Sequence, residues 1–348
     1  MRIVYAGSPA IAVPALEALA VMETPGGSGL PAGDFELAAL LTNPDSRRGR
    51  SGKPEPTATA AALAALEPRF ERLGRRPPRI IKPEKLGSAA RGEIAALKPD
   101  LLVSFAYGRI FGPKFLALFP LGGINVHPSL LPAYRGPTPI PQAILNGDRE
   151  TGITIQRLAP EMDCGNILAQ ERFPLTGSET CAALTGEMAR RAARLLPGVI
   201  RDLGTLRDRP QDREGVSYCG LLSRDDGRID WGADARRIEA QVRAYTPWPL
   251  SWTMDGERRL YILGACLPPA AAGKDAGPAA GTVLGVDKER GILVQTGDGV
   301  LVLTMLQYEA KKALEWRAFL NGARDFIGRR LQAAGLGPGG TGLNNGIC

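Results

Sequence analysis

Residues 101–127 read LLVSFAYGRIFGPKFLALFPLGGINVH, and this stretch decides the fold class. It contains two strongly apolar runs, Leu101–Ala106 and Gly123–His127, with a short helical segment between them. A strand that is apolar on both faces is typical of a parallel sheet, because crossover helices cover such a sheet from both sides. The stretch therefore predicts a strand–helix–strand unit inside an α/β domain.

The same alternation of strand and helix continues toward the amino terminus. Arg2–Ala6 predicts a buried strand, followed by a Gly-Ser-Pro turn and a helix that ends near Ala20. Further strands are expected at Glu36–Thr42 and Arg79–Ile81. The alternation predicts a doubly wound, Rossmann-like parallel sheet, whose ligands collect at the carboxyl ends of the strands. The first turn lacks the G-x-G-x-x-G pattern, so no nicotinamide or flavin cofactor is expected.

The carboxyl half follows a different pattern. A strand at Gly152–Leu158 and a long helix at about Glu179–Leu203 complete a first domain, predicted to span residues 1–204. A charged, turn-rich segment at 205–230 is predicted to be a linker. Short strands separated by Gly and Asp turns are then expected at Ser251–Met254, Arg259–Leu263, Gly281–Val286, Ile292–Gln295 and Val300–Leu306.

Five short strands predict a small β-barrel of the oligonucleotide-binding (OB-like) type, at residues 231–333. A last helix is expected at Leu314–Leu331. The glycine-rich tail at 334–348 is predicted to be disordered, and the segment at 22–34 is a loop by composition.

The composition is that of a globular protein with a basic surface. The 348 residues are 44% hydrophobic and 23% charged, with a formal net charge of +7. This size predicts two domains, and the charge is compatible with a polyanionic partner. Five scattered cysteines without a C-x-x-C pair, together with a single histidine, argue against a disulfide framework and against a metal site. No window is apolar enough to span a membrane and the signal-peptide pattern is broken, so a cytoplasmic location is expected.

The single histidine, His127, ends the second apolar run of the opening stretch. Because alternate residues of a strand share a face, Asn125 and His127 point to the same side. Two polar side chains at the carboxyl end of a central strand break the apolar pattern where sites form, and their burial requires hydrogen-bond partners. A carboxylate is the expected third member. Asp163 is the best candidate, Glu161 is its rival, and a turn or helix-cap role is the alternative for this aspartate.

Three ordered blocks carry a resemblance to a known family. They are NVHPSLLPAYRG at 125–136, ILNGDRETGITI at 144–155 and MDCGNILAQ at 162–170. Together they closely resemble the folate-dependent formyltransferases, which implies 10-formyltetrahydrofolate as the formyl donor and no metal. By position, the resemblance implies a catalytic trio of Asn125, His127 and Asp163, and a tetrahydrofolate site formed by Ser129, Leu130, Leu131 and Pro132.

A basic segment points to the acceptor. TNPDSRRGRSGK, at residues 42–53, directly follows the second predicted strand. Its cations suit either a solvated surface or contact with a phosphate backbone. The segment resembles the loop that the tRNA-acting members of the family insert into the acceptor stem, with Arg50 at the position of their key arginine. The tRNA-binding residues implied here are Arg47, Arg48, Arg50 and Lys53.

The carboxyl half resembles the same members of the family. The matching motifs are RIDW at 228–231, RAYTPWPLSW at 243–252, TGDG at 296–299 and LQYEAKKAL at 306–314. The resemblance implies that Lys311 and Lys312, in the expected barrel domain of this chain, contact tRNA. Leu221 departs from the pattern, because the family usually has a lysine there. The implied partner is initiator Met-tRNA, and a monomer is expected.

The chemistry implied is attack of the methionine α-amino group on the formyl carbon. Asn125 and His127 would donate hydrogen bonds to the oxyanion, and Asp163 would orient the imidazole or accept the amine proton. The alternatives are a UDP-amino-sugar formyltransferase, a 10-formyltetrahydrofolate hydrolase, and a non-catalytic RNA-binding protein. The basic loop argues against the first two, and the intact trio argues against the third. A glycinamide ribonucleotide transformylase would leave the second domain unexplained.

Overall fold

The computed structural model describes residues 1–22, 36–47, 52–72, 74–269 and 277–332. The chain divides into two compact units. Unit 1 comprises Met1–Gln142, Asp148–Thr176 and Ala183–Leu221, and unit 2 comprises Ala143–Gly147, Gly177–Ala182 and Leu222–Cys348. Of the segment predicted to be a linker, residues 205–221 belong to unit 1 and residues 222–230 to unit 2. The predicted loop at 22–34, apart from its first residue, and the predicted disordered tail at 334–348 lie outside the described residues.

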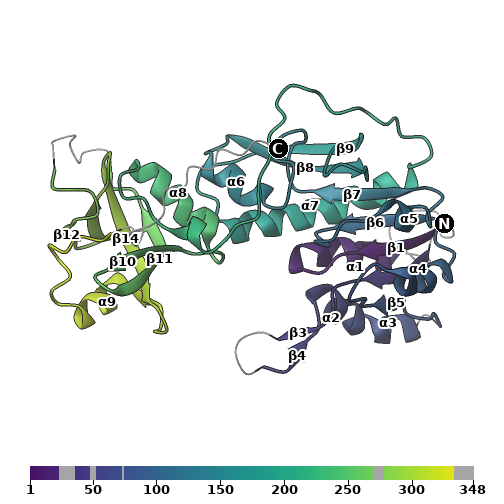
Figure 1. The fold of residues 1–348 in the computed structure, drawn as a ribbon, viewed down its shortest axis with the longest axis horizontal. Coiled ribbons are helices and arrows are strands. Elements are labelled where there is room, and N and C mark those ends of the chain that lie inside the picture. The colour runs from purple at the N-terminus through teal and green to yellow at the C-terminus, as the bar shows by residue number, and fades with distance from the viewer. Residues whose placement is uncertain (23–35, 48–51, 73, 270–276, 333–348) are drawn as a thin grey trace. The chain divides into compact units, whose positions relative to one another are not determined.

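Unit 1 is built on a seven-stranded sheet with the order β5-β2-β1-β6-β7-β8-β9 (Figure 1). The bounds are Arg2–Ala6 (β1), Glu36–Leu41 (β2), Arg79–Ile81 (β5), Leu101–Phe105 (β6), Gly123–His127 (β7), Glu150–Arg157 (β8) and Ile167–Pro174 (β9). The strands from β5 to β7 are parallel, which confirms the predicted doubly wound sheet. β8 and β9 extend it in the antiparallel sense, and β9 was not expected from the sequence.

Helices of unit 1 cover the parallel strands, and the four central ones, β2, β1, β6 and β7, are largely buried on both faces, whereas the edge strand β5 is exposed at Arg79 and Ile80. The bounds of the shorter helices are Ala10–Ala12 (η1), Val13–Met22 (α1), Ala58–Ala65 (α2), Glu67–Arg72 (α3), Ser88–Ala95 (α4), Pro113–Leu116 (α5) and Pro139–Leu145 (α6). One core cluster joins Val4 of β1 and Leu102 of β6 to Ile94 of α4 and Phe115 of α5. Apolar residues of neighbouring strands thus share one covered face, as the opening stretch predicts.

The longest helix, α7, runs from Cys181 to Arg201 and confirms the helix predicted at Glu179–Leu203, with slightly shorter ends. Its buried residues Leu184, Met188, Ala192 and Leu196 recur every four positions, which is the spacing of an amphipathic helix with one apolar stripe.

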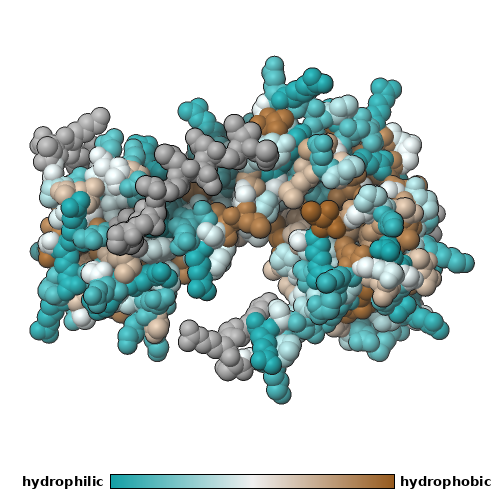
Figure 2. Space-filling view, viewed as in Figure 1, coloured by the Kyte–Doolittle hydropathy of each residue, from teal (hydrophilic) through white to brown (hydrophobic). Residues whose placement is uncertain are grey.

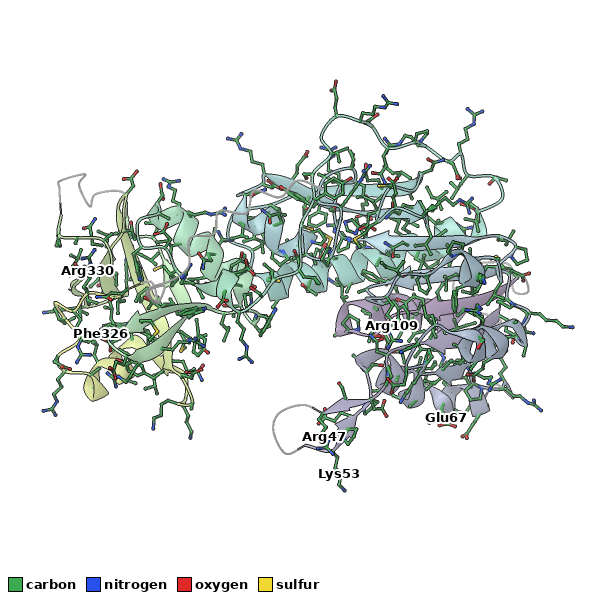
Figure 3. All side chains as sticks on the ribbon, viewed as in Figure 1. Arg47, Lys53, Glu67, Arg109, Phe326 and Arg330 are labelled. Carbon is green, nitrogen blue, oxygen red and sulfur yellow. The ribbon has the colours of Figure 1, made fainter. Side chains whose placement is uncertain are left out.

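A two-stranded hairpin follows β2. Ser46–Arg47 (β3) pairs antiparallel with Pro54–Glu55 (β4), and the hairpin projects from the rest of unit 1 (Figure 1). Arg47 and Lys53 lie on it and are exposed (Figure 3). Its described residues are mainly hydrophilic in the space-filling view (Figure 2). Arg48 and Arg50 of the predicted tRNA-binding set lie outside the described residues.

Unit 2 contains an antiparallel sheet with the order β10-β11-β14-β13-β12, and β15 pairs with β14. The bounds are Ser251–Asp255 (β10), Arg258–Cys266 (β11), Val283–Asp287 (β12), Gly291–Gln295 (β13), Val300–Tyr308 (β14) and Leu314–Glu315 (β15). All five predicted strands are confirmed. A 3-10 turn at Asp225–Gly227 (η2) and the helix Ala235–Tyr245 (α8) precede the sheet.

Residues 328–332 connect the two edge strands of this sheet. Gln332 exchanges backbone hydrogen bonds with Met254 of β10, at 2.9 and 3.0 Å. On the opposite edge, Val283 of β12 donates to the Arg329 carbonyl and accepts from the Gly328 amide, each at 2.8 Å. The strand pairing forms an open sheet and not a closed barrel, and this segment covers both of its edges, which is consistent with the barrel that the sequence predicts.

The same segment corrects one prediction. The helix expected at Leu314–Leu331 is wrong beyond Gly322, because α9 spans only Trp316–Gly322. Gly328 adopts a φ of +85°, which a right-handed helix does not allow. The Arg329 guanidinium instead reaches the buried Asp255 carboxylate, at 2.9 Å. Tertiary contacts of this kind override the helical pattern of a short segment.

Within the described parts of the chain, no helix combines the length and apolar character needed to cross a membrane. Among the same residues, no group of three or more His, Cys, Asp or Glu side chains is placed to hold a metal ion.

Candidate active site

The site lies at the carboxyl end of β7, beside β8. These two strands are antiparallel, and their register sets Asn125 opposite Gln156 and His127 opposite Thr154. Because alternate residues share a face, the two polar residues of β7 lie next to two polar residues of β8. His127 is buried and Asn125 is partly buried. The sheet thus holds a row of polar side chains at its carboxyl edge, where ligands of doubly wound sheets collect.

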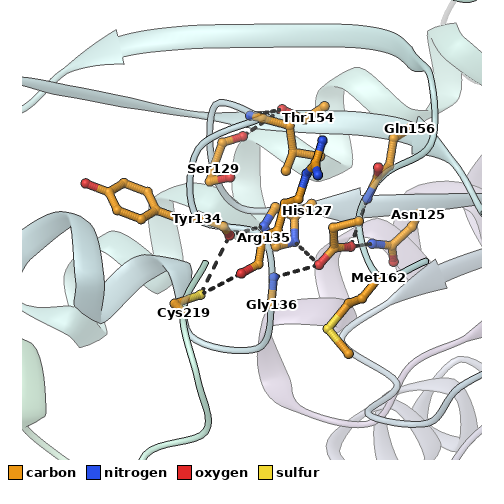
Figure 4. A network of polar contacts seen from close by, with 12 residues as sticks. Asn125, His127, Ser129, Tyr134, Arg135, Gly136, Thr154, Gln156, Met162 and Cys219 are labelled. Carbon is orange, nitrogen blue, oxygen red and sulfur yellow. Dashed lines mark hydrogen bonds and ion pairs between the residues drawn. The ribbon is translucent and has the colours of Figure 1, made fainter. Parts of the chain in front are cut away.

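Asp163 lies in the loop after β8, and four groups converge on its carboxylate (Figure 4). Oδ1 accepts hydrogen bonds from the side-chain amides of Asn125, at 3.3 Å, and Gln156, at 2.8 Å. Oδ2 accepts from the Gly136 amide, at 2.9 Å, and lies 3.6 Å from Nδ1 of His127. The rival carboxylate, Glu161, is exposed. The structure brings Asn125, His127 and Asp163 together around one carboxylate.

The imidazole of His127 has an acceptor at each ring nitrogen. Nε2 lies 2.8 Å from the Tyr134 carbonyl oxygen, and Nδ1 faces Asp163. A carbonyl oxygen only accepts hydrogen bonds, so Nε2 carries a proton and the neutral ring has its lone pair on Nδ1. The Tyr134 carbonyl therefore orients the imidazole, which the sequence predicted for Asp163, and it occupies the ring N–H that was predicted to face the oxyanion. Burial lowers the pKa of His127, against the opposing effects of the Asp163 carboxylate and the Tyr134 carbonyl.

The Ser-Leu-Leu-Pro loop packs against β8. Thr154 donates to the Ser129 carbonyl at 2.7 Å and accepts from the Leu131 amide at 3.2 Å. The Ser129 hydroxyl donates to the Ala133 carbonyl at 2.6 Å, and the Leu131 side chain is buried. Two of the four residues predicted to bind folate therefore hold the loop in shape through their side chains. The backbone atoms of this loop and its partly exposed residues Leu130 and Pro132 remain the groups it can offer to a ligand.

A cavity of about 350 Å³ opens on this loop, and Leu130 lines it. Its other lining residues are Ala133, Tyr134, Asp148, Arg149, Glu150, Thr151 and Arg172. The Tyr134 hydroxyl donates to the Asp148 carboxylate, at 2.6 Å. The cavity borders the loop, whereas none of the three convergent residues, Asn125, His127 and Asp163, lines it.

Gly136 occupies a position that only glycine fits. Its φ is +111°, and a Cβ atom there would lie 2.2 Å from the carbonyl oxygen of Cys219. The absence of a side chain lets residues 135 and 219 pair through their backbones while the Gly136 amide donates to Asp163.

Four contributors to the site were not predicted from the sequence. They are Gln156, the Tyr134 carbonyl, the Gly136 amide, and Gln211, whose side chain donates to the Asp163 carbonyl at 2.7 Å. Gln156 had a signal, because period-two alternation along Gly152–Leu158 puts it on the same face as Thr154. The Tyr134 carbonyl and the Gly136 amide depend on the path of a loop, and Gln211 lies 48 residues from Asp163, so no local pattern indicates these contacts.

The basic hairpin is anchored near the same edge of the sheet. Thr42, which follows β2, contacts Ser8 at 3.2 Å and Thr57 at 2.7 Å through its hydroxyl. Thr57 is the N-cap of α2. Hydroxyl contacts therefore tie both ends of the hairpin to the ends of β1 and β2. In unit 2, the predicted tRNA contacts Lys311 and Lys312 are exposed between β14 and β15.

Two family models match the chain: a formyl transferase model over residues 28–200 and a formyl transferase C-terminal domain model over residues 221–324. The fold and the polar site thus define a two-domain formyl transferase. A methionyl-tRNA formyltransferase from Treponema denticola is 46% identical over 94% of this chain and 98% of its own length. One from Treponema pallidum is 43% identical over 95% and 99%. The chain belongs to the methionyl-tRNA formyltransferase family, whose members are one-carbon group transferases.

Solved structures share the fold at low sequence identity. The sugar 3N-formyl transferase WlaRD, crystallised with dTDP and 5-N-formyl-THF, has a TM-score of 0.59 and 17% identity, covering 90% of this chain and 99% of that chain. An N-formyltransferase from Helicobacter canadensis has a TM-score of 0.58 and 19% identity, covering 86% and 98%. At these identities, the likeness concerns the fold alone.

Proposed function

We propose that this protein transfers the formyl group of 10-formyltetrahydrofolate to the α-amino group of methionine on initiator Met-tRNA, as a step of translation initiation. The observation that carries the proposal is the convergence of Asn125, His127 and Asp163 at one strand end, in a chain 46% identical to a methionyl-tRNA formyltransferase. An amide, an imidazole and a carboxylate are the groups that amine attack on a formyl carbon requires.

The transfer forms a C–N bond between the methionine nitrogen and the formyl carbon. Attack builds negative charge on the formyl oxygen, which needs oriented donors in a water-poor site. Asn125 donates one amide hydrogen to Asp163, and none of the described residues accepts the other, which is free to donate to the oxyanion. The sheet holds this amide in place before the substrate arrives, so little reorganisation is needed during the reaction.

His127 is proposed to accept the proton that the amine loses, and Asp163 to stabilise the protonated imidazole. The lowered pKa keeps the imidazole neutral near pH 7, with its lone pair on Nδ1. The amine proton passes to Nδ1, directly or through a water molecule, and the Asp163 carboxylate stabilises the cation that forms. The proton then moves to N10 of the folate as the bond between N10 and the formyl carbon breaks. The acceptor amine is itself the nucleophile, so no covalent intermediate with the protein is needed.

Contact with tRNA is proposed through basic residues of both units. The exposed Arg47 and Lys53 lie on the anchored hairpin, and the adjoining Arg48 and Arg50 complete its predicted set. Lys311 and Lys312 of unit 2 are proposed to add contacts to the tRNA backbone. Such contacts supply affinity that depends strongly on salt and carries little sequence information.

Incubation with 10-formyltetrahydrofolate and charged initiator tRNA, followed by mass spectrometry of the released amino acid, tests the proposal. Formylmethionine is expected, and it should form far more slowly on charged elongator methionine tRNA. Formylation of a UDP- or dTDP-linked amino sugar, but not of tRNA, would identify a sugar-nucleotide enzyme. Formate release without any acceptor would identify a hydrolase, and tRNA binding without product would identify an RNA-binding protein.

The proposal also includes a location and an assembly state. Charged initiator tRNA is a cytoplasmic molecule in bacteria, so we propose that the protein acts in the cytoplasm. We further propose that it acts as a monomer, because the trio and its partners come from one chain. Light scattering at the concentration of the assay checks the mass.

A further inference from the structure

Residues 208–219, which we call the strap, connect the two loops that form the site. At one end, Arg209 and Ile167 exchange backbone hydrogen bonds of 2.7 and 2.9 Å, just after the loop that carries Asp163. At the other end, Arg135 and Ser217 are joined by a backbone hydrogen bond of 2.8 Å, in the loop that carries Tyr134. The strap therefore links the loop that holds the carboxylate to the loop that holds the imidazole.

Gln211 is the strap residue that contacts the site directly. Its Nε2 donates to the carbonyl oxygens of Asp163, at 2.7 Å, and Gly165, at 2.8 Å, with a longer contact of 3.2 Å to Oε1 of Gln156. Its Oε1 accepts from the Arg135 guanidinium, through Nε at 3.1 Å and Nη2 at 2.8 Å. The guanidinium only donates, so it requires the amide oxygen to face Arg135 and the amide nitrogen to face the Asp163 loop. One side chain thus satisfies two carbonyl groups and one cation.

The loop that Gln211 holds has an unusual backbone. Asp163 has a φ of +54°, which is uncommon for a residue other than glycine. Two residues later, a Cβ atom on Gly165 would lie 1.8 Å from the Arg157 carbonyl oxygen. A backbone in such a conformation persists only when its surroundings hold it in place. The Gln211 amide supplies two of the contacts that do so.

We propose that Gln211 is a positioning residue for Asp163, which sets the carboxylate relative to His127. Gln156 and Gly136 hold the carboxylate oxygens, while Gln211 holds the main chain from which the side chain projects. The carboxylate lies 3.6 Å from Nδ1, so a small displacement of the loop changes its electrostatic effect on the imidazole. The catalytic consequence rests on the proposed formyl transfer, whereas the effect on the imidazole does not.

A purely structural role for the strap makes a different prediction. In that case, any weakened strap contact would lower stability, and none would specifically change the protonation of His127. Asp208 offers the matched control, because it lies on the strap and pairs with Arg157 at 3.1 Å but does not contact Asp163. The chain has a single histidine, so its NMR spectra contain one set of imidazole signals, and their titration is measured without residue assignment.

The experiment compares Gln211→Met, Gln211→Glu and Asp208→Ala in the full chain. Methionine keeps the length and packing of the side chain but removes the amide. Glutamate keeps an acceptor for Arg135 but loses both donors. Both Gln211 variants are expected to lower kcat about 10- to 100-fold, with KM for both substrates changed less than about threefold. Asp208→Ala should retain kcat within about twofold.

In Gln211→Met, the titration midpoint of His127 is expected to fall by at least about 0.3 pH unit, because a displaced carboxylate raises the pKa less. An unchanged midpoint, or an equal kcat loss in Asp208→Ala, would overturn the proposal. Full activity of Gln211→Glu would overturn it as well, since the two donors would then be dispensable. If the wild-type protein formylates no tRNA, the proposed function fails, and the NMR titration still decides whether Gln211 positions Asp163.

Discussion

Asp163→Asn tests the centre of the site with the smallest change of shape. All four groups around the carboxylate present nitrogen atoms, and three of them donate hydrogen bonds to it. An asparagine with its oxygen at the Oδ1 position keeps the hydrogen bonds from Asn125 and Gln156. Its NH₂ group then faces the Gly136 amide, so two donors meet and the Gly136 N–H is left without an acceptor. The same NH₂ group can donate to Nδ1 of a neutral His127.

The magnitudes follow from these contacts. One buried donor without a partner costs about 1 to 3 kcal/mol, so the free energy of unfolding should fall by about that amount. This is a fraction of the roughly 5 to 15 kcal/mol that stabilises an ordinary domain, so the variant should fold. The loss of the negative charge lowers the pKa of His127 further, because Asp163 raises it in the wild type. Without a carboxylate to stabilise the imidazolium, kcat should fall at least about 100-fold.

Three measurements separate these effects. Urea denaturation gives the loss of stability, NMR titration of the single histidine gives the change of pKa, and formyl transfer at saturating substrates gives kcat. Glu161→Gln is the matched control, since it removes the same charge from an exposed side chain in the same loop. Turnover of Asp163→Asn close to that of Glu161→Gln would refute the role given to Asp163. A rise in the pKa of His127 would refute the electrostatic reasoning.

The remaining predictions each concern one charged or titratable group. Arg47→Ala should reduce the slope of log Kd for tRNA against log salt by about 1, and an unchanged slope in filter binding would exclude Arg47 from the interface. Leu221→Lys adds a cation at a side chain that is 84% exposed. It should steepen the slope of log Kd against log salt by about 1 and leave kcat unaltered. A slope equal to that of the wild type would show that this position does not face tRNA. The free energy of unfolding should decrease as pH falls below about 6.5, because the unfolded chain then binds a proton that buried His127 resists. In His127→Asn, urea titrations should show that the free energy of unfolding depends less steeply on pH between about 5.5 and 7.5. A dependence as steep as that of the wild type would show that other groups cause it.

The sequence predicted the parts of the fold that depend on local pattern. Apolar runs gave β1, β2, β6 and β7, and period-two alternation placed Asn125 and His127 on one face. The helix expected at Leu314–Leu331 was wrong beyond Gly322, because its amphipathic pattern conceals a turn and an edge-pairing segment. That pairing depends on contacts with β10 and β12, which are distant in sequence.

In the candidate site, too, local pattern predicted some residues and could not predict others. Side chains in strands could be placed from alternation, and Asp163 was found as an acidic residue in the loop after the next strand. The Tyr134 carbonyl could not be predicted, because the residue has a φ of +59° in a loop whose path depends on Gly136 and the strap. Gln211 lies 48 residues from Asp163 and carries no distinguishing motif. The roles of the trio and of the folate and tRNA contacts stay predictions until they are measured.

The contacts of Gln211 bear on how these proteins can be cut and recombined. A catalytic fragment that stops after residue 204, where the last long helix is over, discards the glutamine that braces the Asp163 loop and the backbone that borders Arg135. Chimaeras that exchange carboxyl-terminal domains between relatives would meet the same problem if the joint were placed there. A joint beyond Leu221 keeps Gln211 in the same fragment as Asp163. The strap is therefore best treated as part of the amino-terminal catalytic unit.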